Sequence, residues 1–314
     1  INKNIAFKEL FNLNNKKNKL NINDLGYLIG PILNAGGRLG KSTFASELLS
    51  SNNAELVNTR SIQLIKLNNK RKEIEMLILN EIDFQKIEND NKDIIIYYNS
   101  NINEGLIGII AARLKDYFNK PSIVVTNSNN FLKGSARSVF NYNIGRAIKN
   151  CLDQGIIING GGHIAAAGFT LHKTYLKNFE EFILKDFSNS GILRNNTFSY
   201  DAEVSSLAFN LGLYTDIKQL EPYGIGNPNP IFLLKDLKVI KSSILNDKHI
   251  SVILKSKTGF SIKSISFNGI NSKVGEYLLN YKGNFNVLGQ INENIWNNKK
   301  TLQLTIRDVV LQLN

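Results

Sequence analysis

Cysteine, tryptophan and histidine are scarce in this sequence. Its 314 residues include one cysteine, one tryptophan and three histidines. The lone Cys151 excludes a disulfide framework and a cysteine-cluster metal site, and it fits a reducing cytoplasm. His163, His172 and His249 are scattered along the chain, and Asp24 is a lone carboxylate near its start. We therefore predict that this chain binds no metal.

Long apolar runs are absent as well. No run approaches the ~20 residues that a membrane-spanning helix needs, and no signal peptide is present. We expect a cytoplasmic protein with no membrane partner. The chain begins with Ile1 and its only methionine is Met76, so we also expect it to be a piece of a longer protein.

Positive charge predominates in the composition. Lysine and arginine number 38 against 26 acidic residues, which gives a net charge of +12. Such an excess points to a polyanionic partner, and nucleic acid is the first candidate. A general bias toward lysine, asparagine and isoleucine would also produce it, so charge alone leaves both interpretations open. With 42% apolar residues, the chain can supply the cores of two or three domains.

The hydrophobic pattern divides the chain into three parts. In residues 1–91, short helices precede a helix of more than thirty residues that begins after Asn52 or Asn53. Residues 92–190 alternate strands with helices, which indicates an α/β domain. Residues 196–314 hold five strand-like runs with one helix between the third and the fourth, which is the plan of an OB fold.

The stretch "ILNAGGRLGKST" raises the possibility of an ATPase. Its core, from Ala35 to Ser42, satisfies a relaxed phosphate-loop pattern. A working phosphate loop lies between a buried strand and a helix, whereas Gly30 and Pro31 precede this one and proline weakens a central strand. No later strand ends in an aspartate placed to hold Mg²⁺. We therefore interpret the segment as a glycine loop with another role.

Five motifs, in order along the chain, carry a resemblance to a known family. They are "GPILNAGGRLG" (30–40), "NEGLIGIIAARL" (103–114), "KGSARS" (133–138), "GGHIAAAGF" (161–169) and "QLEPYGIGNPNPIF" (219–232). They resemble the G-P-R-L-N-A-A-G-R, H-x-G-V-I-G-I-V-A-x-R-L, R-G-S-G-R-S, G-G-H-x-x-A-A-G and Q-L-E-P-F-G-x-G-N-P-x-P-x-F segments of the RecJ family, which are bacterial single-strand-specific 5′ exonucleases. Together the motifs cover nearly the whole chain.

The resemblance implies both a fold and a function. The implied fold is α/β plus β: a mixed-sheet DHH-associated α/β domain joined by a long helix to a five-stranded OB-fold barrel. The implied function is metal-dependent degradation of single-stranded DNA from 5′ to 3′ in recombination and repair. The family's D-x-D and D-H-H motifs, which hold Mn²⁺ or Mg²⁺, lie N-terminal to everything in this chain. The chain alone should therefore bind DNA, contribute no catalytic residue and be inactive.

A pocket for the 5′ phosphate of the strand is also implied by the resemblance. Arg38, Ser135 and Arg137 would form it, since guanidinium groups bind phosphate with paired N–H bonds. Alternation along an extended strand places Ser135 and Arg137 on one face. Without the resemblance, Arg38 is interpreted as a solvated residue beside a glycine turn, and Ser135 as a turn residue.

Further contacts in the substrate cleft are expected from five residues. Asn34 would brace the glycine loop, and His163 would donate to a phosphate, although a histidine in this setting is often structural. Three positions depart from the family pattern: Ile32 replaces an arginine, and Ile102 and Asn103 replace a Trp-His pair, so no proton acceptor remains there. The five expected cleft residues are Asn34, Asn103, Gly161, Gly162 and His163.

The OB domain is expected to hold single-stranded DNA through backbone charge and base stacking. The main candidate residues are Lys248, His249, Lys263 and Trp296, and the wider set adds Lys238, Lys241, Lys255 and Phe267. The expected partners are single-stranded DNA and single-strand-binding protein, and a monomer is expected. Two alternatives stay open: a non-catalytic single-stranded nucleic-acid-binding module, and a DHH-type small-substrate phosphodiesterase, against which the OB domain argues.

Overall fold

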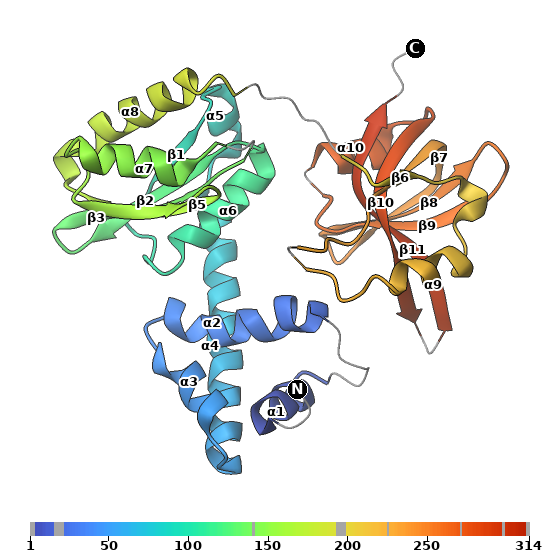
Figure 1. Cartoon of the computed structure of the whole chain (residues 1–314), viewed down its shortest axis with the longest axis horizontal. Helices are drawn as coiled ribbons and strands as arrows, with labels where there is room; N and C mark the ends of the chain where they lie inside the picture. Colours follow the sequence, from blue (N-terminus) through green and yellow to red (C-terminus); the bar gives the residue numbers. More distant parts are fainter. Residues whose placement is uncertain are drawn as a thin grey trace. The chain divides into compact units, whose positions relative to one another are not determined.

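The structure of the chain is a computed structural model. It describes residues 4–15, 22–139, 142–192, 199–224, 226–270, 272–296 and 299–311, without the side chains of residues 295, 296 and 299. The chain divides into two compact units, Ile1–Asn195 and Asn196–Asn314 (Figure 1). Each unit has its own hydrophobic core. None of the helices among the described residues combines the length and hydropathy needed to cross a membrane.

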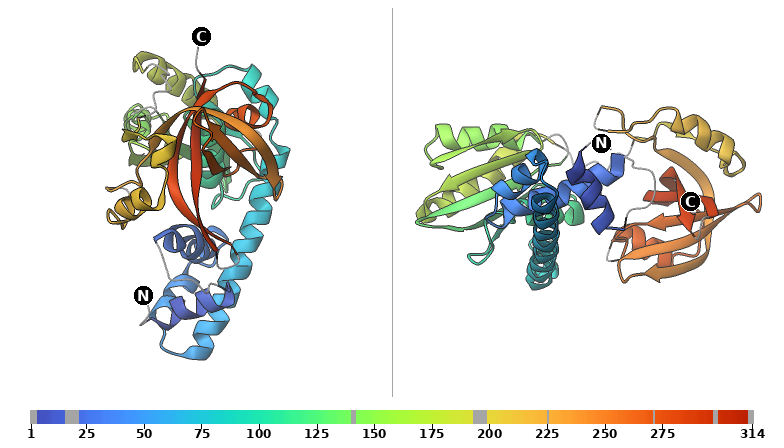
Figure 2. Two further views of the ribbon diagram at one scale, coloured as in Figure 1. Left: turned by 90° about the vertical axis from the view of Figure 1, so that its right-hand side faces the viewer. Right: turned by 90° about the horizontal axis from the view of Figure 1, so that it is seen from below.

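One long helix organises the first half of unit 1. Helix α4 (Ala54–Glu81) begins after Asn53, whose side chain accepts hydrogen bonds from two backbone N–H groups of the first turn. The left view in Figure 2 shows α4 as an unbroken helix, and its 28 residues span about 42 Å at 1.5 Å per residue. The helix is slightly shorter than predicted. Helices α1 (Ile5–Leu13), α2 (Gly30–Arg38) and α3 (Thr43–Ser50) pack on its N-terminal half.

Helical structure occupies the segment that was predicted to be a glycine loop. A π-helical turn, η1 (Asp24–Ile29), continues directly into α2, which ends at Arg38. The loop prediction is therefore wrong for these residues, and the chain turns only at Gly40, where φ is +79°. Gly36 is required inside the helix because a Cβ there would lie 2.5 Å from the carbonyl oxygen of Lys41. A phosphate loop follows a strand, so this segment is not one.

The second half of unit 1 is a five-stranded mixed sheet in the order β1-β2-β3-β5-β4. The strands β1 and β2 are parallel, and every other neighbouring pair is antiparallel. Helix α5 (Phe84–Asn89) precedes the sheet, and the turn η2 (Lys173–Tyr175) follows it. The strands are β1 (Ile95–Tyr98), β2 (Ser122–Ser128), β3 (Phe131–Arg137), β4 (Asn159–His163) and β5 (Ala166–Leu171).

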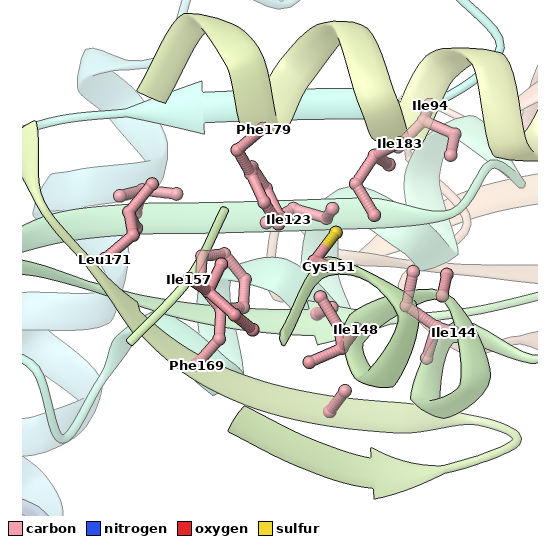
Figure 3. Packing of buried hydrophobic residues seen from close by; sticks show 14 of the residues in the cluster. Ile94, Ile123, Ile144, Ile148, Cys151, Ile157, Phe169, Leu171, Phe179 and Ile183 are labelled. Atoms are coloured by element: carbon pink, nitrogen blue, oxygen red, sulfur yellow. The ribbon is translucent and has the colours of Figure 1, made fainter. Parts of the chain in front are cut away.

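The two faces of this sheet have different covers. Helices α7 (Ile144–Asp153) and α8 (Leu176–Asn189) pack on one face, where their apolar side chains meet those of the strands (Figure 3). Helix α6 (Ile107–Phe118) packs on β2 and β3 from the other side. Alternation therefore sends every second residue of β3 toward α7 and α8, and the residues between them toward α6.

Unit 2 is a closed barrel of five strands. Strand β7 pairs with β8 and also with β10, and β9 pairs in parallel with β11, which closes the sheet on itself. Helix α10 (Lys273–Asn280) lies between β9 and β10, as the OB-fold prediction requires. The five strands are β7 (Phe232–Leu245), β8 (His249–Ser256), β9 (Ser261–Ser266), β10 (Phe285–Trp296) and β11 (Lys299–Leu311).

The predicted fold class, α/β plus an OB-type barrel, is confirmed, and one detail of its connectivity is corrected. Helix α4 precedes the α/β sheet and belongs to the same unit, so it does not join that sheet to the barrel. A short strand that was not predicted, β6 (Ala202–Glu203), pairs in parallel with β7. The turn η3 (Ser206–Ala208) and helix α9 (Leu211–Lys218) lie between these two strands.

Candidate nucleic-acid interface

Strand β3 presents Ser135 and Arg137 on the face that α6 covers. Nη1 of Arg137 donates to Oγ of Ser135 at 3.1 Å and to the carbonyl oxygen of Ala136 at 2.8 Å. The first turn of α6 lies against this pair, because a Cβ on Gly108 would be 2.9 Å from Nη2 of Arg137 and 3.1 Å from Oγ of Ser135. Gly108 thus leaves the space that the guanidinium occupies.

Arg38 reaches the same place from the end of α2. Its Nη1 donates to the carbonyl oxygen of Gly105 at 3.2 Å, in the loop that leads into α6. A Cβ on Gly105 would overlap the backbone of Arg38, so glycine is needed for this contact. Burial lowers the pKa of Arg137, and the nearby charge of Arg38 lowers that pKa further. The two guanidinium groups, far apart in the sequence, therefore lie close together in space.

We call Arg38, Ser135, Arg137 and the first turn of α6 the arginine site. Burial also lowers the pKa of Arg38, yet arginine remains protonated at neutral pH. The first N–H groups of a helix have no acceptor within the helix, and its N-terminus carries partial positive charge. The site thus combines two positive charges and a hydroxyl with the N-terminus of a helix, which together suit a phosphate group.

A buried ion network lies beside Arg38. Glu75 of α4 accepts from Nη1 of Arg71 at 2.7 Å through one carboxylate oxygen, and from Nε of Arg113 at 2.7 Å through the other. Nη2 of Arg71 donates to Oδ1 of Asn68 at 2.7 Å. Sequence reasoning missed this network, although Asn68, Arg71 and Glu75 have the three- and four-residue spacing that brings side chains together on a helix.

The "GGGH" segment forms an edge strand, β4. In the sheet, Arg137 pairs with Ala166 of β5, which pairs with His163 of β4. His163 is exposed and shares the face of Arg137, about 10 Å away at 4.7–4.9 Å per strand. Gly162 differs, because a Cβ there would overlap Ala166 and Ala167; this glycine shapes the hairpin.

On the same face, the neighbouring row of paired residues starts at Ser135 of β3 and continues across β5 and β4 with glycines, which have no side chain. Ser135 pairs with Gly168, and Gly168 pairs with Gly161. Both glycines are exposed, and a Cβ on Gly161 would meet nothing within 4 Å. The arginine site thus borders a strip of bare strand backbone that ends beside His163.

The two asparagines predicted in the cleft have different surroundings. Asn34 is exposed on α2, so it lies in a helix and does not brace a loop. Oδ1 of Asn103 accepts from the backbone N–H of Gly105 at 2.8 Å, which orders the loop that Arg38 contacts. The departures from the family pattern at Ile32 and Ile102 are core residues, with 2% and 3% of their surface exposed.

The barrel brings Lys263 into a hollow of about 210 Å³ with Lys241, Ser243 and Ser251. Lys241 and Lys263 flank Ile253 in one row across β7, β8 and β9. Both lysines were predicted as DNA contacts within a larger set, and strand register makes them neighbours.

Aromatic rings lie beyond the end of β9. The ring of Phe267, which is 57% exposed, packs edge-on against His249 at 5.4 Å between centroids. Nδ1 of His249 accepts from the backbone N–H of Asn268 at 2.9 Å. Lys248 is exposed in the β7–β8 turn, and the side chain of Trp296 lies outside the described part of the chain.

Comparisons with known proteins match both units. Residues 91–189 match the model of the DHHA1 domain, and residues 200–308 match the model of the RecJ OB domain. The chain is 30% identical to the single-stranded-DNA-specific exonuclease RecJ of Haemophilus influenzae, over 86% of this chain and 48% of the relative. It is 25% identical to RecJ of Bacillus subtilis, over 98% of this chain and 39% of the relative. The chain thus spans about half the length of these relatives or less.

A solved structure gives the same fold. RecJ of Thermus thermophilus in complex with Mn²⁺ superposes with a TM-score of 0.81 at 21% identity, covering 99% of this chain and 44% of that one. A second Thermus structure contains Mg²⁺. Within the described ranges of the present chain, no group of three or more histidine, cysteine, aspartate or glutamate side chains could hold a metal. The described residues therefore do not fit either ion.

Replacing Gly105 by alanine should separate α2 from α6. The new Cβ would overlap the backbone of Arg38, which cannot move as easily as a side-chain tip. We expect a loss of about 1–3 kcal/mol in the free energy of unfolding, the usual cost of overpacking. Thermal or urea unfolding measures it. Gly37→Ala is the matched control, because its Cβ would meet nothing within 4 Å; equal stabilities for the two variants would contradict the described contact.

Proposed function

The chain belongs to the RecJ family, of which it carries the DHHA1 and OB domains, and we propose that it is the DNA-holding part of an exonuclease that degrades single-stranded DNA from 5′ to 3′. The observation that carries this proposal is the meeting of Arg38 and Arg137 at the first turn of α6. The relatives' names supply the reaction class, and the arginine site supplies a reason for its direction.

The arginine site would take the 5′ phosphate of the strand. A terminal phosphate carries up to two negative charges and three free oxygens, whereas an internal phosphodiester carries one charge and has the chain continuing on both sides. Two guanidinium groups, the Ser135 hydroxyl and helix-end N–H groups can engage the terminal group from several sides. Preference for a terminus at this position gives the reaction its 5′ polarity.

The following nucleotide would pass over the bare strip beside the arginine site. Gly161 and Gly168 leave the sheet backbone uncovered there, so a sugar-phosphate chain can approach it closely. His163 at the end of the strip would donate a hydrogen bond to a phosphate. Asn103 would act indirectly, by ordering the loop that Arg38 contacts.

The barrel would hold a more distant part of the strand. Lys241 and Lys263 supply positive charge in the hollow, and Phe267 beside His249 offers an exposed ring for base stacking. Lys248 extends the charged surface at the neighbouring turn. The face of strands 2 and 3 is the usual nucleic-acid surface of an OB fold, and β8 and β9 correspond to those strands.

Hydrolysis would require the Mn²⁺ or Mg²⁺ site of the complete enzyme. Two-metal hydrolysis needs several ligands around ions about 3.5–4 Å apart, and the described residues offer no such group. We therefore infer that this chain binds DNA without cutting it. We also propose that it acts as a monomer in recombination and repair in the cytoplasm. Single-strand-binding protein is a candidate partner. A purely non-catalytic binding module is the second candidate, favoured by the same lack of ligands.

Arg137→Ala tests the assignment of the arginine site. Loss of a charge-assisted contact should weaken binding of a 5′-phosphorylated oligonucleotide by about 10- to 100-fold. Binding of the same oligonucleotide with a 5′ hydroxyl should change much less. Fluorescence anisotropy measures both affinities, and Arg146→Ala, an exposed arginine on α7, is the control. Equal losses for the two oligonucleotides would remove Arg137 from the site.

Gly108→Ala tests the same site without deleting a charge. The new Cβ would displace the tip of Arg137, which is flexible, so the stability cost is small. Alanine is also the better helix former, by about 1 kcal/mol. We expect an unchanged or higher Tm together with weaker binding of the 5′-phosphorylated oligonucleotide. A variant with wild-type affinity would show that the guanidinium position does not matter for binding.

Lys241→Ala combined with Lys263→Ala tests the barrel surface. Each lost phosphate contact should reduce the salt dependence of single-strand binding, so two should lower the log–log slope by about 1.4. Lys235→Ala is the control, because its ammonium group is already paired with Glu203 at 2.6 Å. An unchanged slope in the double variant would place the DNA on another face of the barrel.

A further inference from the structure

Glu75 lies in α4 at the junction of two hydrophobic cores. Up to Leu67, the apolar residues of α4 pack with α1, α2 and α3. From Ile74 onward, they pack with β1, β2, α5 and α6. The ion network of Asn68, Arg71, Glu75 and Arg113 lies at the crossing, where α4 passes from one core to the other.

The network joins α4 to α6. The side chains of Arg71 and Glu75 are only 11% and 8% exposed, and buried charges are tolerated only when they are paired and hydrogen-bonded. Both carboxylate oxygens of Glu75 are used, one on α4 and the other on Arg113 of α6. Helix α2 packs on the same helix through Gly36, where a Cβ would be 3.2 Å from Leu64. The carboxylate thus fixes α6 to the helix that carries α2.

Arg38 is under electrostatic strain at this junction. Besides burial, the charge of Arg71 lowers the pKa of Arg38, while the charge of Glu75 raises it. Arg137 adds a further positive charge near Arg38. Like charges at close range repel in a half-buried site, so Arg38 stays beside Arg137 only if the surrounding elements hold it there.

We propose that Glu75 is the positioning residue of the arginine site: by binding Arg71 of α4 and Arg113 of α6 together, it holds Arg38 beside Arg137 before any ligand arrives. The inference rests on the proposed function, because the ligand of the arginine site is taken to be a 5′ phosphate. Preorganised donors bind more tightly, since no free energy is used to bring them together on binding.

A role of Glu75 through its charge alone predicts the opposite change in phosphate affinity. If Glu75 acted only through its charge, it would weaken phosphate binding, and its removal would tighten it. If it positions Arg38, its removal weakens binding even though the net positive charge of the site increases. The sign of the change therefore distinguishes positioning from charge.

Glu75→Gln is the decisive variant. It keeps the shape of the side chain and removes the charge that binds both arginines. We expect the affinity for a 5′-phosphorylated oligonucleotide to fall about tenfold, the scale of one lost charge-assisted contact, with little change for the 5′-hydroxyl form. The control is Glu73→Gln, which removes the same charge from an exposed position on the same helix. Tm is measured for every variant.

Arg113→Lys provides a second route if Glu75→Gln does not fold. Arg113 is 51% exposed and lysine keeps its charge, so the fold should tolerate the change. Lysine cannot reproduce the Nε contact with Glu75. Positioning predicts the same selective loss for the 5′-phosphorylated oligonucleotide, whereas an effect of charge alone predicts wild-type affinity.

The outcomes separate this inference from the proposed function. A wild-type chain that binds both oligonucleotides equally would contradict the proposed 5′-phosphate site itself. A wild-type preference that Glu75→Gln and Arg113→Lys both retain or increase would overturn only the positioning role. An equal loss for both oligonucleotides would also overturn it, because it would show a general structural defect.

Discussion

Two like charges held close together are the constraint on which the candidate site depends. Arg38 and Arg137 come from different parts of unit 1, and each loses part of its solvation by entering a half-buried site. Their approach requires backbone contacts that leave no room for side chains. Gly105 provides one such contact, against the backbone of Arg38, and Gly108 provides the other, against the guanidinium of Arg137. The glycines of the "NEGLIGII" motif thus have a packing explanation.

Helix α6 covers only part of one sheet face, and the uncovered part borders the arginine site. Helix α6 packs on β2 and β3, while the same face of β5 and β4 carries Ala166, Gly168, Gly161 and His163. The N-terminus of α6 therefore lies at Arg137, where the uncovered part of the sheet begins. A ligand bound there by its terminal group can extend over strand backbone without meeting a bulky side chain. The small residues leave this face open, whereas large residues on the opposite face, such as Phe169, pack in the core.

The sequence predicted most of the strands and the barrel because their signals are local. Alternating apolar residues and the position of α10 were enough for the OB plan, whereas the glycines of α2 were misread as a loop. Gly36 lies in a helix and packs closely against Leu64 and the backbone of Lys41. Gly161 is extended because β5 pairs with it. Leu64 is remote from Gly36 in sequence, whereas Lys41 and β5 follow closely on the glycines that they contact. The pairing of Arg38 with Arg137 came from family resemblance, and Glu75 was missed because its two arginines lie on different helices.

If the arginine site binds phosphate as proposed, charge balance would favour a terminal phosphate over an internal one. The carboxylate of Glu75 pairs with Arg71 and Arg113, and its charge also acts on Arg38. That pairing leaves one net positive charge in the network, and Arg38 and Arg137 each add another. A terminal phosphate, whose second pKa is about 6, carries close to two negative charges at neutral pH and can neutralise both. A phosphodiester carries one. Two unit charges 4 Å apart interact with about 4 kcal/mol at an effective dielectric constant of 20. The extra negative charge of a terminal phosphate would therefore distinguish it from a phosphodiester even if solvent screening removed most of this energy.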